Sequence, residues 1–350
     1  MNWWLASYKQ PDQNSKDLAL ARQAQLTKPT GALGDLETIA VKIAALQCTS
    51  RPYVNAPWIS LFAGDHGVMA EQVSAYPQEV TRQMLLNFAS GGACISVIAQ
   101  QYQAKLQVID CGTVGEAHHM QGVEYQAVAA GTQNFAKTQA MTEEQCVQAM
   151  TIGKNSVDQA AAHHADMFIA GEMGIGNTCS ASALACLLLN ESAEVLTGVG
   201  TGITDEKLVH KKQVIQQAVD LHQAQVGNDP IQILAAVGGF EIAAMVGAYL
   251  RCAQVGLPIL VDGFISSVAA LLAVRIQPLT QQWMLFGHQS AEYGHRRILQ
   301  ALDVQPIVQL NLRLGEGSGA GVALGVVKLA CALHNQMATF SEAAVTGDKQ

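Results

Sequence analysis

The segment RLGEGSGAGVALGV, residues 313–326, places one carboxylate among glycines just before a long apolar run. Glycine lets a backbone turn sharply and lets a ligand approach closely, so Glu316 is expected to face a ligand rather than bulk solvent. A second carboxylate, Glu172, lies at the start of the glycine-rich segment GEMGIGNTCSAS, residues 171–182. These two well-presented carboxylates are the first candidates for chemistry.

The segment around Glu172 also has the features of an anion site. An apolar run leads into a glycine-rich turn, Asn177 or Thr178 can cap the next helix, and small residues leave backbone N–H groups free. A phosphate suits such a site. The Glu172 carboxylate would repel a phosphate bound beside it, so its presence there indicates a function of its own. The alternative is a tight strand-to-helix connection. The segment matches neither GxGxxG nor GxxxxGK(S/T), so nothing supports a dinucleotide or Walker-type site.

Three further segments place polar side chains after apolar runs. Asp65 and His66 form an acid–base couple or a metal site, or else a hydrogen-bonded turn without further function. Lys207 and Lys211 lie four residues apart and either reach back to an anion or form a solvated face. Asp262 either binds ribose hydroxyls or caps the helix that follows it.

The segment FGHQSAEYGHRR, residues 286–297, supplies the last polar group. Ser290 is a candidate phosphate ligand. His288, Glu292 and His295 are polar candidates whose alternative is a solvated helix surface.

Composition narrows the functional classes. The chain has 350 residues, of which 49% are hydrophobic and 14% charged, and this is typical of a globular protein. The net charge of -8 and the absence of long basic clusters argue against nucleic acid as a partner. Eight scattered cysteines without CxxC, no signal peptide and no apolar run long enough for a bilayer predict a cytoplasmic protein without a membrane partner. HExxH and GxSxG are also absent, so metal and acyl-enzyme chemistry have little support.

These residues need a scaffold that brings their loops together. Short β-rich runs ending at or near glycine alternate with longer amphipathic stretches, and the runs are residues 58–64, 105–112, 165–171, 194–200, 257–263 and 283–288. The pattern predicts an α/β fold with a doubly wound, mostly parallel sheet. Ligands then bind beyond the carboxyl ends of the strands, where the polar segments lie.

Both ends of the chain show helical spacing instead. Apolar residues recur with helical period between Leu33 and Ile43, and the stretch 320–338 has the same period. We expect a small helical domain formed by residues 1–50 with 325–350, and a large Rossmann-like catalytic domain over residues 51–324.

Together these segments resemble the nicotinate-nucleotide:dimethylbenzimidazole phosphoribosyltransferase family. The resemblance runs in order over most of the chain and rests on KPTGALGDLE, AGDHGVMAEQVSAYPQEVT, GEMGIGNT, VGTGITDEKLVHKK, VGGFEIAAMVGAYL, VDGFISS, HQSAEYGH and RLGEGSGAGVAL. It implies a Rossmann-like large domain, a small helical domain from both chain ends, and a homodimer.

The resemblance also implies a reaction. The phosphoribosyl group of nicotinate mononucleotide passes to 5,6-dimethylbenzimidazole, giving α-ribazole 5'-phosphate and nicotinate. Glu316 is the implied general base, and Glu172 is placed to stabilise a developing oxocarbenium ion. The nicotinate ring is cationic while it is bound to the ribose and becomes neutral when it departs, so it is a good leaving group. Neither a metal nor a cofactor is therefore expected.

The family implies contacts to the substrates as well. The 5'-phosphate is assigned to Gly174, Gly176, Lys211 and Ser290, and the aromatic base to Tyr76, Met84 and Leu314. The remaining substrate-binding candidates are Asn177, Thr178, Asp262, Asp65 and His66.

Two departures from the family pattern are visible. Tyr76-Pro77-Gln78 stands where members often carry Ser-Pro-Lys, and Cys179 stands where they carry Thr. The first leaves the choice of aromatic base open. Two alternative functions remain. One is a non-catalytic nucleotide-binding module. The other is a nucleotide-dependent oxidoreductase, which would require a GxGxxG motif that this sequence lacks.

Overall fold

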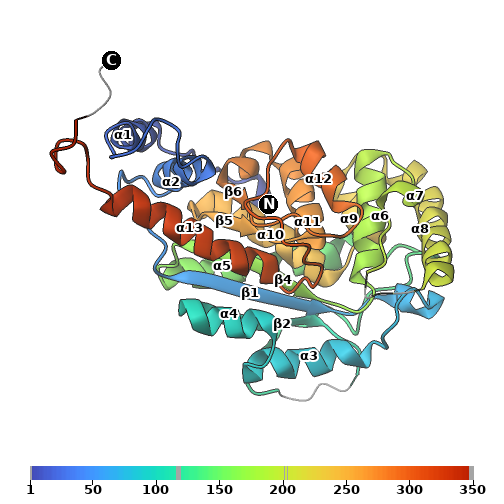
Figure 1. Ribbon diagram of the computed structural model, residues 1–350. Helices are drawn as coiled ribbons and strands as arrows, with labels where there is room; N and C mark the ends of the chain where they lie inside the picture. Colours follow the sequence, from blue (N-terminus) through green and yellow to red (C-terminus); the bar gives the residue numbers. More distant parts are fainter. Residues whose placement is uncertain (1, 116–119, 201, 203, 347–350) are drawn as a thin grey trace.

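The computed structural model describes residues 2–115, 120–200, 202 and 204–346. In this part of the chain, six strands form one sheet in the order β3-β2-β1-β4-β5-β6, and every neighbouring pair is parallel (Figure 1). The strands are β1 Pro57–Gly64, β2 Lys105–Gly112, β3 Val123–Tyr125, β4 Met167–Met173, β5 Ile259–Val261 and β6 Met284–Phe286. The predicted doubly wound α/β fold is confirmed.

The strand order reverses between β1 and β4, which are hydrogen-bonded neighbours with Phe62 opposite Glu172. Chain connections leave this point in opposite directions, so a crevice opens outside the carboxyl ends of the two strands. The topology therefore places the loops after β1, β4, β5 and β6 at one edge of the sheet.

One predicted strand is wrong. Residues 194–200 fall in the short helix α7 (Ala193–Leu196) and the loop after it, and Leu196 is fully buried. Asn190 ends the preceding helix in a left-handed conformation, and Gln216 of α8 (Asp205–Val226) accepts the N–H of Ala193. The run therefore packs among helices instead of joining the sheet. Thr201 and Ile203 of the same predicted loop lie outside the described residues.

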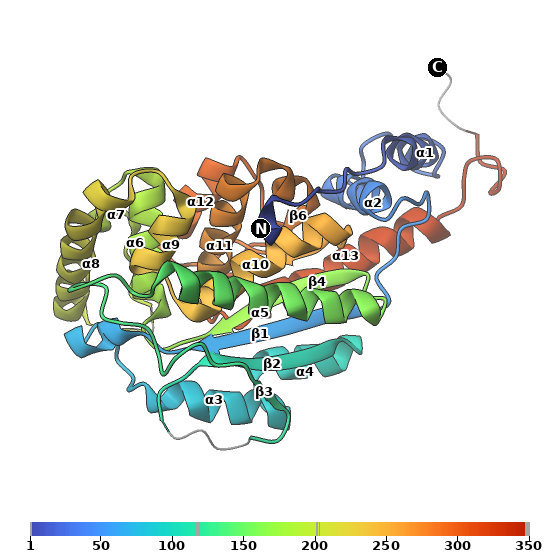
Figure 2. The same ribbon diagram turned by 180° about the vertical axis from the view of Figure 1, so that it is seen from behind.

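Helices cover both faces of the sheet (Figures 1 and 2). α4 (Cys94–Tyr102) and α13 (Ser318–Gln336) lie on one face, and α5 (Glu143–Ala162) and α10 (Phe240–Val255) on the other. α5 and α10 cross closely because glycines meet backbone there: a Cβ on Gly153 would lie 1.7 Å from the Ala244 carbonyl oxygen, and one on Gly247 would lie 2.0 Å from that of Met150.

The remaining helices surround the carboxyl edge and connect the layers. They are α3 Glu79–Ser90, α6 Asn177–Leu189, α8 Asp205–Val226, α9 Pro230–Val237, α11 Phe264–Ile276 and α12 His295–Leu302, with 3-10 turns at Trp3–Leu5, Gly67–Glu71 and Pro278–Trp283. Side chains cap several of them, since Thr204 accepts the N–H of Lys207 and Asp229 accepts that of Ile231. α6 to α9 gather beyond the arrowhead of β1 (Figure 1).

The two ends of the chain lie side by side. α1 (Gln13–Gln23) and α2 (Asp35–Leu46) pack near the carboxyl end of α13 (Figure 1). The Arg22 guanidinium donates to the carbonyl oxygens of His334 and Asn335, at 2.7 and 2.9 Å. The division into a small domain (1–50 with 325–350) and a large domain (51–324) stays a prediction, and its boundary at residue 324 falls within α13. None of the described helices is long and apolar enough to cross a bilayer.

Candidate active site

A cleft of about 450 Å³ opens at the carboxyl edge of the sheet. It lies at the switch point that the strand order creates, where a doubly wound fold binds its ligand. The predicted site residues that line it are Tyr76, Met84, Glu172, Gly174, Asn177, Thr178, Asp262, Ser290, Leu314 and Glu316. The structure thus brings together both carboxylates, most of the glycine-rich loop and the predicted base pocket.

The loop that carries Glu316 has an unusual backbone. Gly315, Glu316 and Gly317 have φ angles of 84°, 66° and 83°, so three consecutive residues are left-handed immediately before α13. Glycine adopts this region freely, whereas glutamate pays a steric cost of about 1–2 kcal/mol. The loop also lies directly on β4, because a Cβ on Gly171 would lie 2.4 Å from the Glu316 carbonyl oxygen. The strained conformation directs the Glu316 side chain into the cleft.

The Glu316 carboxyl is buried but unpaired. Its side chain is 6% exposed, and Oε2 has no hydrogen-bond partner in the part of the chain that the structure describes. Burial, and then the charge of Asp262, raise the pKa of Glu316 to about 7. A carboxylate with a pKa near neutrality and a free oxygen at a cleft is suited to general base catalysis.

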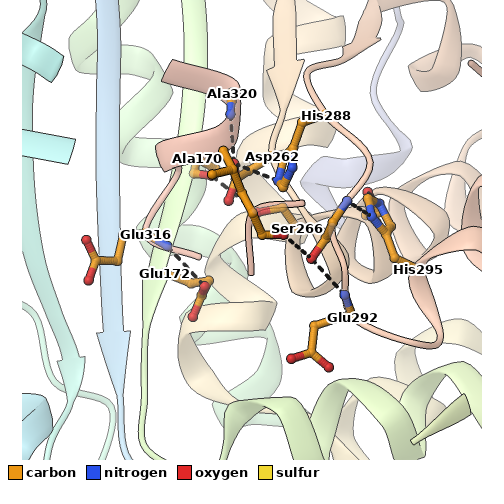
Figure 3. Close-up of polar contacts among 12 residues, drawn as sticks. Ala170, Glu172, Asp262, Ser266, His288, Glu292, His295, Glu316 and Ala320 are labelled. Atoms are coloured by element: carbon orange, nitrogen blue, oxygen red, sulfur yellow. Dashed lines mark hydrogen bonds and ion pairs between the residues drawn. The ribbon is translucent and has the colours of Figure 1, made fainter. Parts of the chain in front are cut away.

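Glu172 lies beside it at the end of β4 (Figure 3). Its Oε1 accepts the backbone N–H of Glu316 at 3.3 Å, and the Asn177 side-chain amide donates to Oε2. Burial raises the pKa of Glu172 to about 8, with further contributions from Asp262 and Glu241. Glu172 is therefore mostly protonated at neutral pH, and a cationic ligand would favour its ionised form.

Asp262, which follows β5, is buried and has the most hydrogen-bond donors around it of the three carboxyls. Its Oδ1 accepts the N–H of Ala320 in the first turn of α13 at 2.7 Å, and Nε2 of His288 lies 3.6 Å away (Figure 3). Burial raises the pKa of Asp262, while His288 and the amides of Ala320, Gly263 and Gly317 lower it. Asp262 therefore has more hydrogen-bond donors around its carboxyl than Glu172 or Glu316, and these donors oppose the effect of burial on its pKa. The prediction that Asp262 caps the helix after it is wrong, because α11 has no side-chain cap and the carboxyl instead accepts an N–H from the first turn of α13.

The glycine-rich loop forms one end of the cleft. Gly176 precedes α6 with a φ of 100°, and Thr178 in the first turn accepts the Lys211 ammonium at 2.8 Å. Gly176 and Lys211 do not themselves line the cleft. Lys211 lies directly behind it, because a Cβ on the lining residue Gly200 would be 3.1 Å from its Nζ. Burial lowers the pKa of Lys211. Lys207, one turn earlier, is exposed, so the structure separates the two lysines.

Ser290 lies at the same end and is held by a buried network. Its Oγ donates to the Leu312 carbonyl oxygen at 3.2 Å, and its N–H donates to Nδ1 of His295 at 2.8 Å. Burial lowers the pKa of His295 to about 3, with a further contribution from His288. Both histidines are buried, so the solvated-surface alternative is wrong for them.

Two charged lining residues were not assigned to a substrate from the sequence: Arg313 was not singled out, and Glu292 was named only as a polar candidate. Arg313 lines the cleft, and its guanidinium donates to the Gly200 carbonyl oxygen at 3.3 Å. Glu292 also lines it, and burial raises the pKa of that carboxyl against the charge of Lys211. The signal for Arg313 was its position in RLGEGSG, three residues before Glu316. Glu292 carried only the weaker signal of a polar residue after a strand.

Asp65 and His66 do not reach the cleft. Asp65 is buried and accepts the Thr81 hydroxyl at 2.7 Å and the Val114 N–H at 2.8 Å. Nε2 of His66 lies 2.7 Å from Oε1 of Glu241, and both side chains are 0% exposed. A Cβ on Gly174 would lie 3.2 Å from the His66 ring, so the pair supports the glycine-rich loop from below. Their placement favours the structural alternative for this segment.

The opposite end of the cleft is apolar and open. Tyr76 and Leu314 are 52% and 58% exposed, and Val80, Met84 and Ile175 lie with them in the lining. Such a surface is able to stack against a planar aromatic ligand that enters from solvent. The arrangement therefore combines an anion-binding end, a central pair of carboxyls and an aromatic-binding mouth.

Comparison with known proteins agrees with this geometry. A family model described as Phosphoribosyltransferase matches residues 8–345. Two proteins from Pseudomonas fluorescens, strains Pf-5 and SBW25, are named nicotinate-nucleotide–dimethylbenzimidazole phosphoribosyltransferase. The Pf-5 protein is 56% identical to this chain, and the match covers 98% of each. The SBW25 protein is 55% identical, and the match covers 98% of this chain and 97% of the relative. The crystal structure of CobT from Thermus thermophilus superposes with a TM-score of 0.91 at 42% identity, covering 95% of this chain and 99% of that one.

The match extends over the sheet, the cleft and both chain ends, and the relatives share more than half of their residues with this chain. A likeness of that extent includes the loops that build the cleft as well as the scaffold. The chain therefore belongs to the nicotinate-nucleotide–dimethylbenzimidazole phosphoribosyltransferase family.

Proposed function

We propose that this protein transfers the phosphoribosyl group of nicotinate mononucleotide to 5,6-dimethylbenzimidazole, yielding α-ribazole 5'-phosphate and nicotinate for the nucleotide loop of cobalamin. The observation that carries the proposal is the unpaired Glu316 carboxyl with a pKa of about 7, placed between an anion-binding end and an apolar mouth. The names and high identity of the Pseudomonas relatives support the same reaction.

Glu316 acts as the general base. One ring nitrogen of the benzimidazole attacks the anomeric carbon from the face opposite to nicotinate, while Glu316 removes the proton from the other ring nitrogen. The bond between the anomeric carbon and the pyridinium nitrogen breaks, and its electron pair neutralises the nicotinate ring. The configuration inverts, and the proton ends on the Glu316 carboxylate.

Glu172 stabilises positive charge at the reacting centre. The bound mononucleotide brings a pyridinium cation, and the transition state spreads that charge onto the ribose ring. A cation near Glu172 lowers the pKa of its carboxyl from about 8 and so favours the charged form. Glu172 thus gains its negative charge when the substrate that needs it is present.

The glycine-rich end holds the 5'-phosphate. Gly174 and Thr178 line this end with backbone N–H groups at the N-terminus of α6, whereas the N–H of Asn177 is bonded to the Gly174 carbonyl oxygen at 2.9 Å and only its side chain faces the cleft. Lys211 contributes charge through Thr178, and Ser290 lies on the same side of the cleft. Gly176 provides the left-handed turn that starts the helix.

The apolar mouth receives the aromatic base. Tyr76, Met84 and Leu314 line it, and they offer mainly apolar surface to the ligand. Gln78, at the position of the first family departure, donates to the His66 carbonyl oxygen at 2.9 Å and is not part of the lining. Cys179, the second departure, is fully buried in α6. The Tyr76 position is therefore where base preference is set.

We also propose that the protein is a homodimer in the cytoplasm. The family resemblance supports the dimer, and the exposed apolar residues Val322 and Leu329 along α13 agree with a covered surface. All eight cysteines are unpaired, in agreement with a reducing compartment.

The test is a direct assay of the purified protein with nicotinate mononucleotide and 5,6-dimethylbenzimidazole, with products resolved by chromatography and mass. Nicotinate and α-ribazole 5'-phosphate in equal amounts are expected. Turnover only with another acceptor, such as a purine or a phenol, would show that the protein is a phosphoribosyltransferase whose acceptor is not 5,6-dimethylbenzimidazole. Binding of the mononucleotide without turnover across such a panel would favour a non-catalytic module.

A further inference from the structure

Two carboxyls hold the Glu316 loop from opposite sides. Glu172 accepts the N–H of Glu316 at 3.3 Å. Asp262 accepts the N–H of Ala320 at 2.7 Å, and its carboxyl also interacts with the backbone amide of Gly317. The amides of Glu316 and of the next residue are therefore bound by different acids, one at the end of β4 and one after β5 (Figure 3).

The backbone of this loop needs that support. Three consecutive left-handed residues, Gly315 to Gly317, form a backbone that only glycine adopts at low cost, and the amides of Glu316 and Gly317 both meet carboxyl groups. The N-terminus of α13 begins directly after them and favours negative charge at the same place. In this structure the Asp262 carboxylate lies there, at the start of the helix.

Asp262 is itself held in place by close packing. The His288 ring lies beside it, with Nε2 3.6 Å from Oδ1, and both side chains are buried. A Cβ on Gly319 would lie 2.0 Å from the His288 ring, and one on Gly263 would lie 2.9 Å from its Nε2. The ring occupies this position because both residues lack a side chain, so Asp262 has little freedom to move away from the loop.

We propose that Asp262 is the positioning residue of Glu316: it fixes the backbone that presents the general base, and its charge makes that base stronger. The inference deepens the proposed function and rests on it. Asp262 acts through Glu316 and does not need to touch the substrate. This role differs from the ribose contact that the sequence suggested for it.

The charges around Glu316 give the expected sign. Glu172 on β4 and Asp262 after β5 face it, and Asp262 raises its pKa. His288 faces Asp262 from the β6 loop, Arg313 lines the cleft on the same segment as Glu316, and Glu241 of α10 acts on Glu172. Removing the Asp262 charge therefore lowers the pKa of Glu316, which extends its ionised form to lower pH and weakens it as a base.

The first test is the variant Asp262→Asn, which keeps an oxygen acceptor for the Ala320 N–H and loses the charge. With both substrates saturating, the acidic limb of kcat against pH should shift down by about 0.5–1 pH unit. The plateau should fall roughly 3- to 10-fold because the base is weaker, while KM for nicotinate mononucleotide stays unchanged. Asp262→Ser, whose hydroxyl also caps helices, provides a second chargeless variant with the same expected shift.

The matched control is Asp166→Asn. Asp166 is another buried aspartate that accepts two backbone N–H groups, from Asn55 and Ala56, and it does not line the cleft. Its replacement should leave the position of the limb unchanged, which separates the Asp262 charge from the general loss of a buried carboxylate.

A second measurement does not depend on turnover. Carbon-13 NMR of protein labelled at glutamate carboxyls gives the titration of Glu316, assigned by its absence in Glu316→Gln. The midpoint should be lower in Asp262→Asn than in the parent by the same amount as the kinetic limb. An unchanged midpoint, or a raised KM with an unshifted limb, would overturn the inference and favour a ribose contact. A parent protein without transferase activity would contradict the proposed function, and the NMR comparison would still decide the role of Asp262.

Discussion

Two groups of buried titratable side chains lie near the carboxyl edge of the sheet, and they are built in opposite ways. After β1, His66 and Glu241 form an ion pair at 2.7 Å with both side chains fully buried. After β4 and β5, Glu172, Asp262 and Glu316 form an all-acidic cluster that lines the cleft. The first group contains its own counter-charge, and the second lacks a cation of comparable proximity among the described residues.

The difference separates support from chemistry. Burial would lower the pKa of His66, but Glu241 more than offsets that effect, and the buried pair packs against the glycine-rich loop. In the acidic cluster, burial and like charges raise the pKa values of Glu172 and Glu316 to about 8 and 7. Carboxyl groups that line a cleft and have pKa values near neutrality are able to exchange protons with a ligand. A buried ion pair that does not reach the cleft is not.

The largest effect is expected from Glu316→Gln. The amide keeps the size of the side chain and cannot accept the benzimidazole proton, so kcat should fall by about 10²–10⁴-fold with little change in KM. Steady-state assays at about pH 8 measure it, where the parent Glu316 is mostly ionised. Turnover equal to the parent would show that another group removes the proton, while leaving the reaction itself in place.

The converse experiment breaks the ion pair. Glu241→Ala leaves His66 buried without its counter-charge, which should cost about 3–5 kcal/mol in the free energy of unfolding. The pKa of His66 is raised in the folded state, so this contribution is fully present below the unfolded value and is lost as pH rises through the folded one.

Denaturant unfolding of Glu241→Ala and the parent should therefore differ most at acidic pH and less at alkaline pH. The folded variant should retain far more kcat than Glu316→Gln. A variant that loses turnover as severely as Glu316→Gln while keeping parental stability would place the pair in the chemistry, against this account.

A third experiment uses the stability of the acidic cluster. The pKa of Glu172 is raised to about 8, so the folded state is penalised progressively as pH rises from the usual range of a glutamate toward that value. Glu172→Gln mimics the protonated acid and removes the penalty. The Tm of the variant should exceed that of the parent at alkaline pH and approach it in mildly acidic buffer, as followed by calorimetry. The opposite pH trend would mean that Glu172 is ionised in the empty cleft.

The smallest effect is expected at the mouth. Leu314 is 58% exposed and loses only part of its remaining surface to a bound base. Leu314→Ala should raise KM for 5,6-dimethylbenzimidazole by about 3- to 10-fold, given the value of a partly buried apolar side chain. KM for nicotinate mononucleotide should hardly change. A larger effect on the mononucleotide would move the base to a different part of the cleft.

The sequence predicted best the features whose cause is local. Glycines beside Glu316, the small residues after Glu172, and the glycine-ended apolar runs all identify their roles within a few neighbouring residues. The predicted cap was wrong: Asn177 and Thr178 lie inside α6, Gly176 occupies the N-cap position, and no side chain caps the helix. The fold followed from that regular alternation, apart from residues 194–200, whose apolar spacing serves helix packing. β3 was missed because Val123–Tyr125 does not lie in a longer apolar run, whereas the equally short β5 and β6 do.

The predictions that depended on distant partners were weaker. His66 and Glu241 are 175 residues apart, and no local pattern distinguishes a histidine that will meet a buried acid from one that will face a ligand. Lys211 reaches Thr178 from another helix, and Asp262 caps α13 rather than its own helix. Arg313 and Glu292 enter the cleft only because the chain folds their loops against Gly200 and Gly198.

The most direct test of the central claim is the pH dependence of kcat, measured from about pH 5 to 9 for the parent and Glu316→Gln with both substrates saturating. If Glu316 is the base, the parent should show an acidic limb with a midpoint near 7, the pKa of its carboxyl. The residual activity of Glu316→Gln should lack that limb. A limb at the same pH in both proteins would contradict the assignment, because the titrating base would then be another group.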